Sequence, residues 1–122
     1  MKLIIQNILF MDFKQQKLLR DIIDCINHIE NYLGPNKIYE IYENSMLLQD
    51  AVERNIITIG EAMSALLKLN SQIEISNSRR IVDARNKLTH GYDEIENVQI
   101  WNIIINHLPK LHKEASILLN EL

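Results

Sequence analysis

Residues 39–69 read YEIYENSMLLQDAVERNIITIGEAMSALLKL. Apolar side chains recur in this segment every three or four residues, which is the spacing that makes one face of an α-helix apolar. The stripe consists of Ile41, Leu48, Val52, Ile56, Ile59, Met63 and Leu66. Further apolar side chains widen it, at Leu47, Ala51, Ala62 and Leu69. We therefore expect a single long helix from Tyr39 to Leu69 that is buried on two sides.

Gly60 lies inside this predicted helix. Glycine costs about 1 kcal/mol relative to alanine in the interior of a helix. The close approach of another helix compensates for that cost, because a residue without a Cβ leaves room for it. We therefore expect a second helix to contact the first at Gly60.

The segments on either side carry the same helical spacing. Residues 12–33 begin at Asp12, a suitable N-cap, and end at Gly34–Pro35. Residues 95–122 also place apolar side chains every three or four positions, but Pro109 interrupts them. A proline inside a helix predicts a kink, a break or an extra short helix, with the preceding turn distorted.

A shorter helix is expected before the last one. Residues 70–78 are polar and loop-like, and Ser76 or Ser78 can cap a third helix that runs to about His90 and stops at Gly91. Four helices of unequal length with short connections predict an all-α protein, an antiparallel four-helix up-and-down bundle.

The composition fits one helical domain. The chain has 122 residues, enough for a single core and too few for two domains. It contains 3 Gly and 2 Pro, where average usage would give roughly eight and six, so few turns are expected. The net charge is -3, which excludes a global positive field for binding nucleic acid or an anionic membrane. Any phosphate site must therefore be a local patch.

Other features of the sequence bear on where in the cell the protein is located and on where its folded domain begins. The single cysteine, Cys25, cannot form an internal disulfide, which favours a reducing cytoplasm. The first residues lack the pattern of a signal peptide, and no apolar run is long enough to span a membrane. Because helical patterning starts at Asp12, we interpret residues 1–11 as an N-terminal extension, with Met11 as an alternative start, and residues 12–122 as the domain.

The concentrated basic patch is the segment RRIVDARNKLTHGY, residues 79–92. Four cations and one anion give it a local charge of +3, namely Arg79, Arg80, Arg85 and Lys87 against Asp83. Arg85 carries a planar fork that matches a phosphate. His90 is an imidazole, which transfers protons near neutral pH, and Tyr92 adds a phenol. A solvated C-terminal helix turn without chemistry is the alternative interpretation.

Geometry limits how these residues cooperate. Arg85 and His90 lie about 140° apart around an ideal helix, so one helix does not present both on one face. If the helix ends at Gly91, His90 lies in its last turn and Tyr92 can turn back beside it. Two such helix ends that meet across a twofold axis would gather two copies of each side chain in one cleft. A symmetric dimer is therefore expected.

These residues resemble a known family. Residues 85–92, RNKLTHGY, are similar to the signature of HEPN-domain proteins, an Arg, four residues, His, any residue and Tyr, in the HepT-like (DUF86) branch. Residues 51–55 (AVERN) and 59–62 (IGEA) resemble the second-helix signature of that branch, and residues 95–101 the start of its last helix. The resemblance covers roughly residues 12–120. Ala84 stands where a bulkier apolar residue is expected.

The resemblance implies a function. Members of this branch are helical dimers that act as metal-independent endoribonuclease toxins, with tRNA as the suggested substrate and no cofactor. Their antitoxin is a minimal nucleotidyltransferase that can transfer AMP onto the motif tyrosine. By this resemblance Arg85 and His90 are the catalytic pair, Asn86 is the supporting polar residue, and Tyr92 is the modified one. The alternatives are a non-catalytic module that presents a substrate to the nucleotidyltransferase, and a scaffold with a decaying site.

Other residues support the patch. Arg79, Arg80 and Lys87 are expected to bind RNA. Glu61 follows the glycine that admits the third helix, so its carboxylate is expected to pair with Arg79, Arg80 or Arg85 and to hold the patch in place.

The remaining candidates are interpreted as structural. Cys25 and His28 are three residues apart but have no further metal ligands near them in the sequence, so no metal site is predicted. His107 and His112 lie on different helix faces and are given no function. Trp101 is expected to pack in the core or at a dimer interface, rather than to stack on a base.

Overall fold

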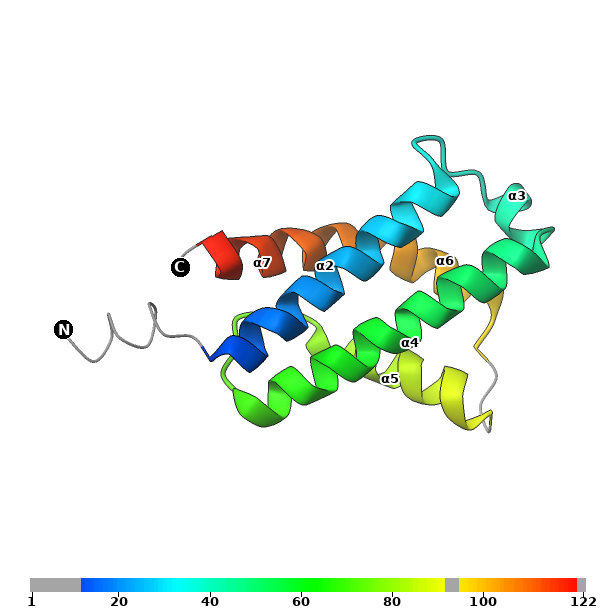
Figure 1. The fold of residues 1–122 in the computed structure, drawn as a ribbon. Coiled ribbons are helices and arrows are strands. Elements are labelled where there is room, and N and C mark those ends of the chain that lie inside the picture. The colour runs from blue at the N-terminus through cyan, green and yellow to red at the C-terminus, as the bar shows by residue number, and fades with distance from the viewer. Residues whose placement is uncertain (1–11, 92–94, 121–122) are drawn as a thin grey trace, which may run out of the picture.

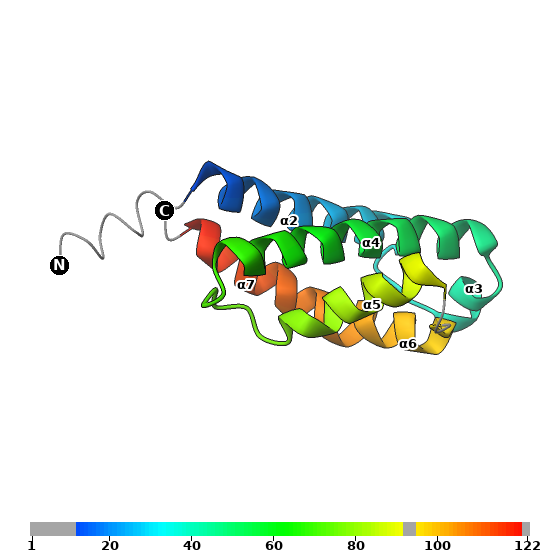
Figure 2. The same cartoon turned by 90° about the horizontal axis from the view of Figure 1, so that it is seen from below.

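The computed structural model describes residues 12–91 and 95–120, and the secondary structure within them is helical (Figure 1). The elements in chain order are α2 (Phe13–Leu33), α3 (Tyr39–Glu43), α4 (Met46–Leu69), α5 (Ser78–His90), α6 (Asn97–Asn102), the π-helical turn η1 (Ile103–His107) and α7 (Leu108–Asn120). The long elements alternate in direction, and α6, η1 and α7 continue one another as the fourth (Figure 2). The prediction of an all-α bundle is confirmed. The proposed extension and alternative start lie outside the described residues.

A single apolar core holds the bundle together. It contains the inward faces of α2, α4 and α7, together with buried residues of the other elements, and no charged residue is buried among the described ones. These other buried residues are Tyr42, Ile73, Ile75, Ile81, Val82, Ala84, Ile100, Ile103 and Ile104. Trp101 packs with the rings of Tyr39 and Tyr42, whose centroids lie 5.6 and 5.5 Å from its own. The expectation that Trp101 is a packing residue is confirmed. Among the described helices, none is both long and apolar enough to cross a membrane.

The ends of α2 follow the sequence signals. The side chain of Asp12 accepts a hydrogen bond from the Lys14 backbone N–H, which caps the helix. Gly34 ends it at φ +75°, a left-handed conformation that residues with a side chain rarely adopt. Both predicted ends of this helix are confirmed.

The single helix expected over residues 39–69 is wrong, because the chain breaks at Asn44–Ser45. The Asn44 side chain donates to the Glu40 carbonyl and ends α3, whereas the Ser45 hydroxyl accepts from the Leu48 N–H and caps α4. These short polar side chains bond to the backbone and compete with a continuous helix.

Part of the predicted apolar stripe also faces outward. Ile41 is 56% exposed and Leu47 is 80% exposed, and Leu69 at the far end of α4 is exposed as well. The break explains the first two errors, because it changes the rotation of α3 relative to α4 and places Leu47 in the first turn of α4. The stripe from Val52 to Leu66 is buried as expected.

The start of helix α5 differs from the sequence prediction, whereas its end agrees with it. Neither Ser76 nor Ser78 occupies its N-cap, so that prediction is wrong. Asn77 is the N-cap, with a left-handed φ of 55°, and Ser76 instead bonds to Glu114 through both its N–H and its hydroxyl, at 2.9 and 2.7 Å. At the other end Gly91 has φ +66° and stops the helix directly after His90, as predicted.

Pro109 distorts the turn before it, as predicted. Proline has no N–H, and its ring collides with the carbonyl four residues earlier in a regular helix. The chain responds with the wider turn η1, in which the Leu108 N–H donates to the Ile103 carbonyl five residues earlier. The helical rod therefore continues past Pro109 without a break.

Helices α4 and α5 approach each other most closely at Gly60, as the sequence predicted. A Cβ built on Gly60 would overlap the Cβ of Arg85, and it would lie 2.8 Å from the Arg85 Cγ and 3.0 Å from the Ile81 carbonyl oxygen. Only a residue without a side chain fits this contact. The stem of Arg85 therefore lies directly on the backbone of α4.

We predict that Gly60→Ala destabilises the protein although alanine favours helices. The added methyl group must displace the Arg85 stem or the α5 backbone, at a cost of about 1–3 kcal/mol. That cost outweighs the roughly 1 kcal/mol that alanine contributes over glycine. Urea denaturation followed by circular dichroism measures the change.

Thr58→Ala is the matched control, because Thr58 lies exposed on the same helix. It should leave the urea midpoint unchanged or raise it slightly. A Gly60→Ala variant that unfolds at a higher urea concentration than the wild type would contradict the packing at this contact.

Candidate functional site

Arg85 is held in a fixed position at the contact between α4 and α5. Its side chain is 30% exposed, and its Nε is buried without a hydrogen-bond partner among the described residues. The guanidinium emerges at the edge of the contact, where Nη1 donates to the Asn86 Oδ1 at 3.0 Å and Nη2 lies 3.6 Å from the Glu61 Oε1. Packing therefore fixes the stem, and polar groups orient the charged end.

The ion pair expected of Glu61 is present, and Arg85 is its partner. The pair forms because Gly60 lets α5 approach and Glu61 is the next residue along α4. The Glu61 side chain is 54% exposed, so water screens the pair and its free energy is small. Its contribution is to hold the guanidinium in one direction at the surface, where a phosphate could reach it.

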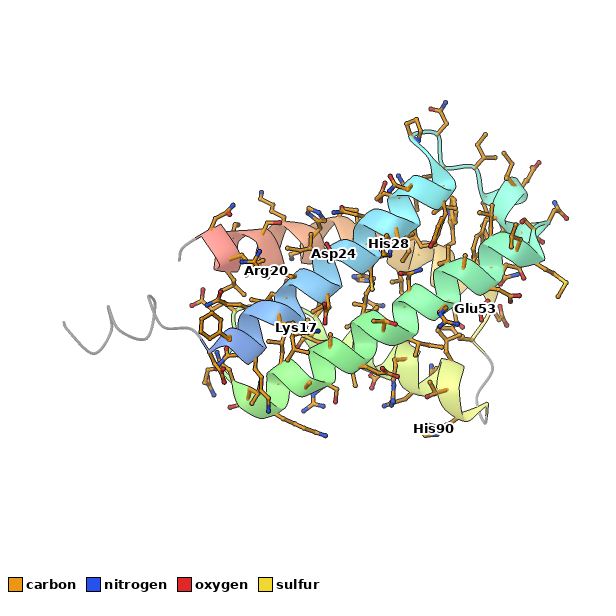
Figure 3. All side chains as sticks on the ribbon, viewed as in Figure 1. Lys17, Arg20, Asp24, His28, Glu53 and His90 are labelled. Atoms are coloured by element: carbon orange, nitrogen blue, oxygen red, sulfur yellow. The ribbon has the colours of Figure 1, made fainter. Side chains whose placement is uncertain are left out.

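His90 lies at the end of α5, at the lower edge of the molecule in Figure 3. Helix α5 is continuous from Arg85 to His90, so the two side chains keep the separation of about 140° around the axis that an ideal helix gives. The last turn is tied by the Thr89 hydroxyl, which donates to the Arg85 carbonyl at 2.9 Å. One copy of the chain therefore does not bring Arg85 and His90 onto one face. Tyr92 lies outside the described residues.

The other predicted cations divide into two groups. Arg79, Arg80 and Lys87 are all exposed on α5. Arg80 and Lys87 line a groove of about 380 Å³ between α5 and α6, whereas Arg79 is not among the described residues that line it. The basic patch is thus not one cluster, since Arg85 faces α4 and the groove lies on another side of α5.

Two further basic residues lie near the start of α5. His107 and Lys110 line a narrow cavity of about 20 Å³ together with Arg80. Burial lowers the pKa of His107, and the charges of Arg80 and Lys110 lower it further. The sequence predicts no function for His107 and no role for Lys110, because their neighbour Arg80 is far away in the sequence.

The residues interpreted as structural occupy structural positions. Cys25 is buried, and desolvation together with Asp21 and Asp24 raises its pKa, so its thiol is unreactive at neutral pH. His28 lies on the surface, with its Nδ1 3.3 Å from the Asn55 Oδ1, and so does not share a site with Cys25. Figure 3 shows His28 following Lys17, Arg20 and Asp24 along α2.

His112 bonds to a neighbouring helix and is not part of a group of metal ligands among the described residues. His112 bonds through Nε2 to the Asn27 Oδ1 of α2, at 3.1 Å, and lies apart from His107. Within residues 12–91 and 95–120, no three His, Cys, Asp or Glu side chains are grouped so that they could hold a metal ion.

Comparison with known proteins identifies relatives. The sequence model of the family described as "Ribonuclease HepT-like" matches residues 22–118. A Methanocaldococcus jannaschii protein named "Putative RNase MJ1380" is 30% identical over 101 residues, which cover 81% of this chain and 91% of that protein. Another protein of that organism, "Putative RNase MJ1216", is 25% identical over 105 residues, covering 85% of this chain and 86% of the relative.

A third relative is longer. "Gamma-glutamylcyclotransferase and putative RNase MJ0434", from the same organism, is 29% identical over 105 residues, and the match spans 47% of its length. No solved structure matches the chain significantly.

We predict that Glu61 and Arg85 are weakly coupled. In a double-mutant cycle with Glu61→Gln and Arg85→Gln, the coupling should be about 0.2–1 kcal/mol, as for other solvent-exposed ion pairs. It should decrease when salt is added, because salt screens exposed charges. Urea denaturation of the four proteins at two salt concentrations measures it.

The control cycle combines Glu61→Gln with Arg79→Gln, since no ion pair joins these two residues in the described part of the chain. It should give no coupling. Equal coupling in the two cycles would contradict a specific pair between Glu61 and Arg85.

Proposed function

Because the chain belongs to the HepT-like ribonuclease family, we propose that it is an endoribonuclease that cleaves RNA without a metal ion. The names of its relatives support a nuclease of this kind. The observation that carries the proposal is the fixed guanidinium of Arg85, which Glu61 of α4 and Asn86 of α5 direct to the surface. Arg85 lies on α5, the helix that ends at His90. Arg85 and His90 are the proposed catalytic residues.

A second copy of the chain completes the proposed site. Arg85 and His90 point in different directions from one continuous helix, so the arginine and histidine that meet at one phosphate are best supplied across a dimer interface. A twofold axis near the C-terminal end of α5 would gather two arginines and two histidines. We therefore propose a homodimer with a composite cleft.

The proposed reaction uses the nucleophile that RNA carries. One His90 accepts the proton of the 2′-hydroxyl, whose oxygen attacks the neighbouring phosphorus, and the bond from phosphorus to the 5′-oxygen breaks. The second His90, in its protonated form, donates a proton to the leaving 5′-oxygen, which leaves a 2′,3′-cyclic phosphate. Arg85 stabilises the negative charge that builds up on the phosphorane oxygens.

Control of this reaction is proposed to lie in a partner. We propose that the protein is the toxin of a toxin–antitoxin pair in the cytoplasm, with tRNA as its substrate and a minimal nucleotidyltransferase as its antitoxin. The partner would transfer AMP from ATP to the Tyr92 hydroxyl and release pyrophosphate. The added phosphate and nucleoside would repel and displace the RNA backbone.

We predict that the purified protein cleaves RNA in EDTA and that His90→Ala lowers the rate about 100-fold or more, because a general acid or base is lost. Gel analysis of a labelled tRNA transcript measures the rate. His112→Ala is the control, since His112 bonds to Asn27 away from α5, and it should retain activity. Cleavage that disappears in EDTA and returns with magnesium would overturn the metal-independent mechanism.

We predict that co-expression with the partner nucleotidyltransferase adds one AMP to the wild-type protein and suppresses its cleavage of RNA. Tyr92→Phe removes the acceptor hydroxyl, so it should carry no AMP and should stay toxic beside the partner. Intact-mass spectrometry and growth assays measure both effects. A neutralised wild type without an adduct would instead indicate occlusion by the bound partner, as expected of a non-catalytic binding module.

A further inference from the structure

A groove separates α5 from α6 on the side of α5 that does not pack on α4. It has a volume of about 380 Å³, and its floor contains the small side chain of Ala84 and the apolar Ile103. Val98 adds an apolar side chain that is 53% exposed. Figure 2 shows α5 next to α6 at the lower right of the bundle.

Polar side chains form both walls of this groove. Arg80, Asp83 and Lys87 line it from α5, and Gln99 and Asn102 line it from α6. The spacing of three and four residues places the α5 side chains in one row. A phosphate backbone would meet two cations there. The side-chain amide nitrogens of Gln99 and Asn102 could donate to base edges, since their oxygens already accept from the Glu96 N–H and the Asn106 Nδ2.

Further basic residues lie near both ends of the groove. Arg80 also lines the narrow cavity with His107, Lys110 and Glu114, whose carboxylate bonds to Ser76. Basic residues therefore continue from α5 toward α7. At the other end Lys87 lies three residues before His90, and residues three apart are neighbours on a helix surface. The row from Arg80 to His90 is about 15 Å long, because ten residues of α-helix rise about 1.5 Å each.

We propose that single-stranded RNA lies in this groove, with its phosphates on Arg80, Lys87 and Lys110, and runs from there to His90. This inference rests on the proposed ribonuclease function and adds the path by which the substrate reaches the site. The net charge of the chain is -3, so a concave surface with several cations is a specific place for a polyanion. The exposed apolar side chain of Val98 suits the face of an unpaired base.

Asp83 allows a test based on the direction in which the RNA affinity changes. It lies between Arg80 and Lys87 in the row and repels a phosphate, so its removal should strengthen RNA binding. A merely structural role of the groove would predict weaker or unchanged binding for the same variant. Asp83→Asn keeps the size of the side chain and changes its charge alone.

The experiment measures binding of a single-stranded RNA about 12 nucleotides long whose 2′-O-methyl groups prevent cleavage. Arg80→Gln, Lys87→Gln and Lys110→Gln should each weaken binding about fivefold near 0.1 M salt, because one phosphate contact contributes about 0.7 to the slope of log affinity against log salt concentration. Each should also reduce that slope, and Asp83→Asn should raise the affinity. Circular dichroism checks that every variant is folded.

Two matched controls lose the same charge from the same helices. Arg79 and Lys113 are exposed and are not among the described residues that line the groove or the narrow cavity. Arg79→Gln should therefore weaken RNA binding clearly less than Arg80→Gln does. Lys113→Gln should likewise weaken it clearly less than Lys110→Gln does. Equal losses in each pair would overturn the groove and indicate only a diffuse charge effect.

Cleavage by the wild type separates this inference from the proposed function. A wild type that neither cleaves nor binds RNA overturns both. A wild type that cleaves RNA, with groove variants that bind like the controls, overturns the groove alone. Groove variants that keep their RNA affinity but lose binding to the nucleotidyltransferase also overturn it, since the groove would then hold a protein partner.

Discussion

The contact between Gly60 and the stem of Arg85 is the constraint on which the rest of the site depends. Because the glycine has no Cβ, α5 lies on the α4 backbone, and the Cβ and Cγ of Arg85 pack against Gly60. The Glu61 pair then acts on a side chain that is already confined. An exposed ion pair contributes about 0.2–1 kcal/mol, whereas overpacking a helix contact costs about 1–3 kcal/mol. Packing therefore determines where the Arg85 stem lies, and the polar groups only orient the guanidinium at its end.

The sequence was sufficient to predict most of the fold. Periodic apolar residues, the Asp12 cap and the glycines at 34 and 91 predicted the helices and several of their ends. The error over residues 39–69 arose because apolar spacing continued across a polar pair, Asn44–Ser45, whose side chains favour a local break. Periodicity reports which faces are apolar, and it does not report whether the backbone between two apolar turns is continuous.

The site was predictable in part. The approach at Gly60 and the pairing of Glu61 with an arginine follow from neighbouring positions in the sequence, so they could be expected before the structure. The surroundings of Arg80 could not be predicted from the sequence. They depend on how α6 and α7 are rotated about their common axis, and that rotation is set by tertiary packing and by the distorted turn before Pro109. The roles of Arg85 and His90 came from the resemblance, since a basic helix end alone has other uses.

The turn η1 can be understood as one residue inserted into an otherwise regular helix. If the same residues kept regular α-helical bonding through this turn, the extra residue would rotate α6 by about 100° relative to α7. Gln99 and Asn102 would then leave the side of α5, although the buried face of α7 stayed in the core. Pro109 opposes this regular bonding, because its ring collides with the carbonyl four residues earlier in a regular helix. The inserted residue and the proline together fix the rotational phase of α6, and with it the surface that α6 presents across from Lys87.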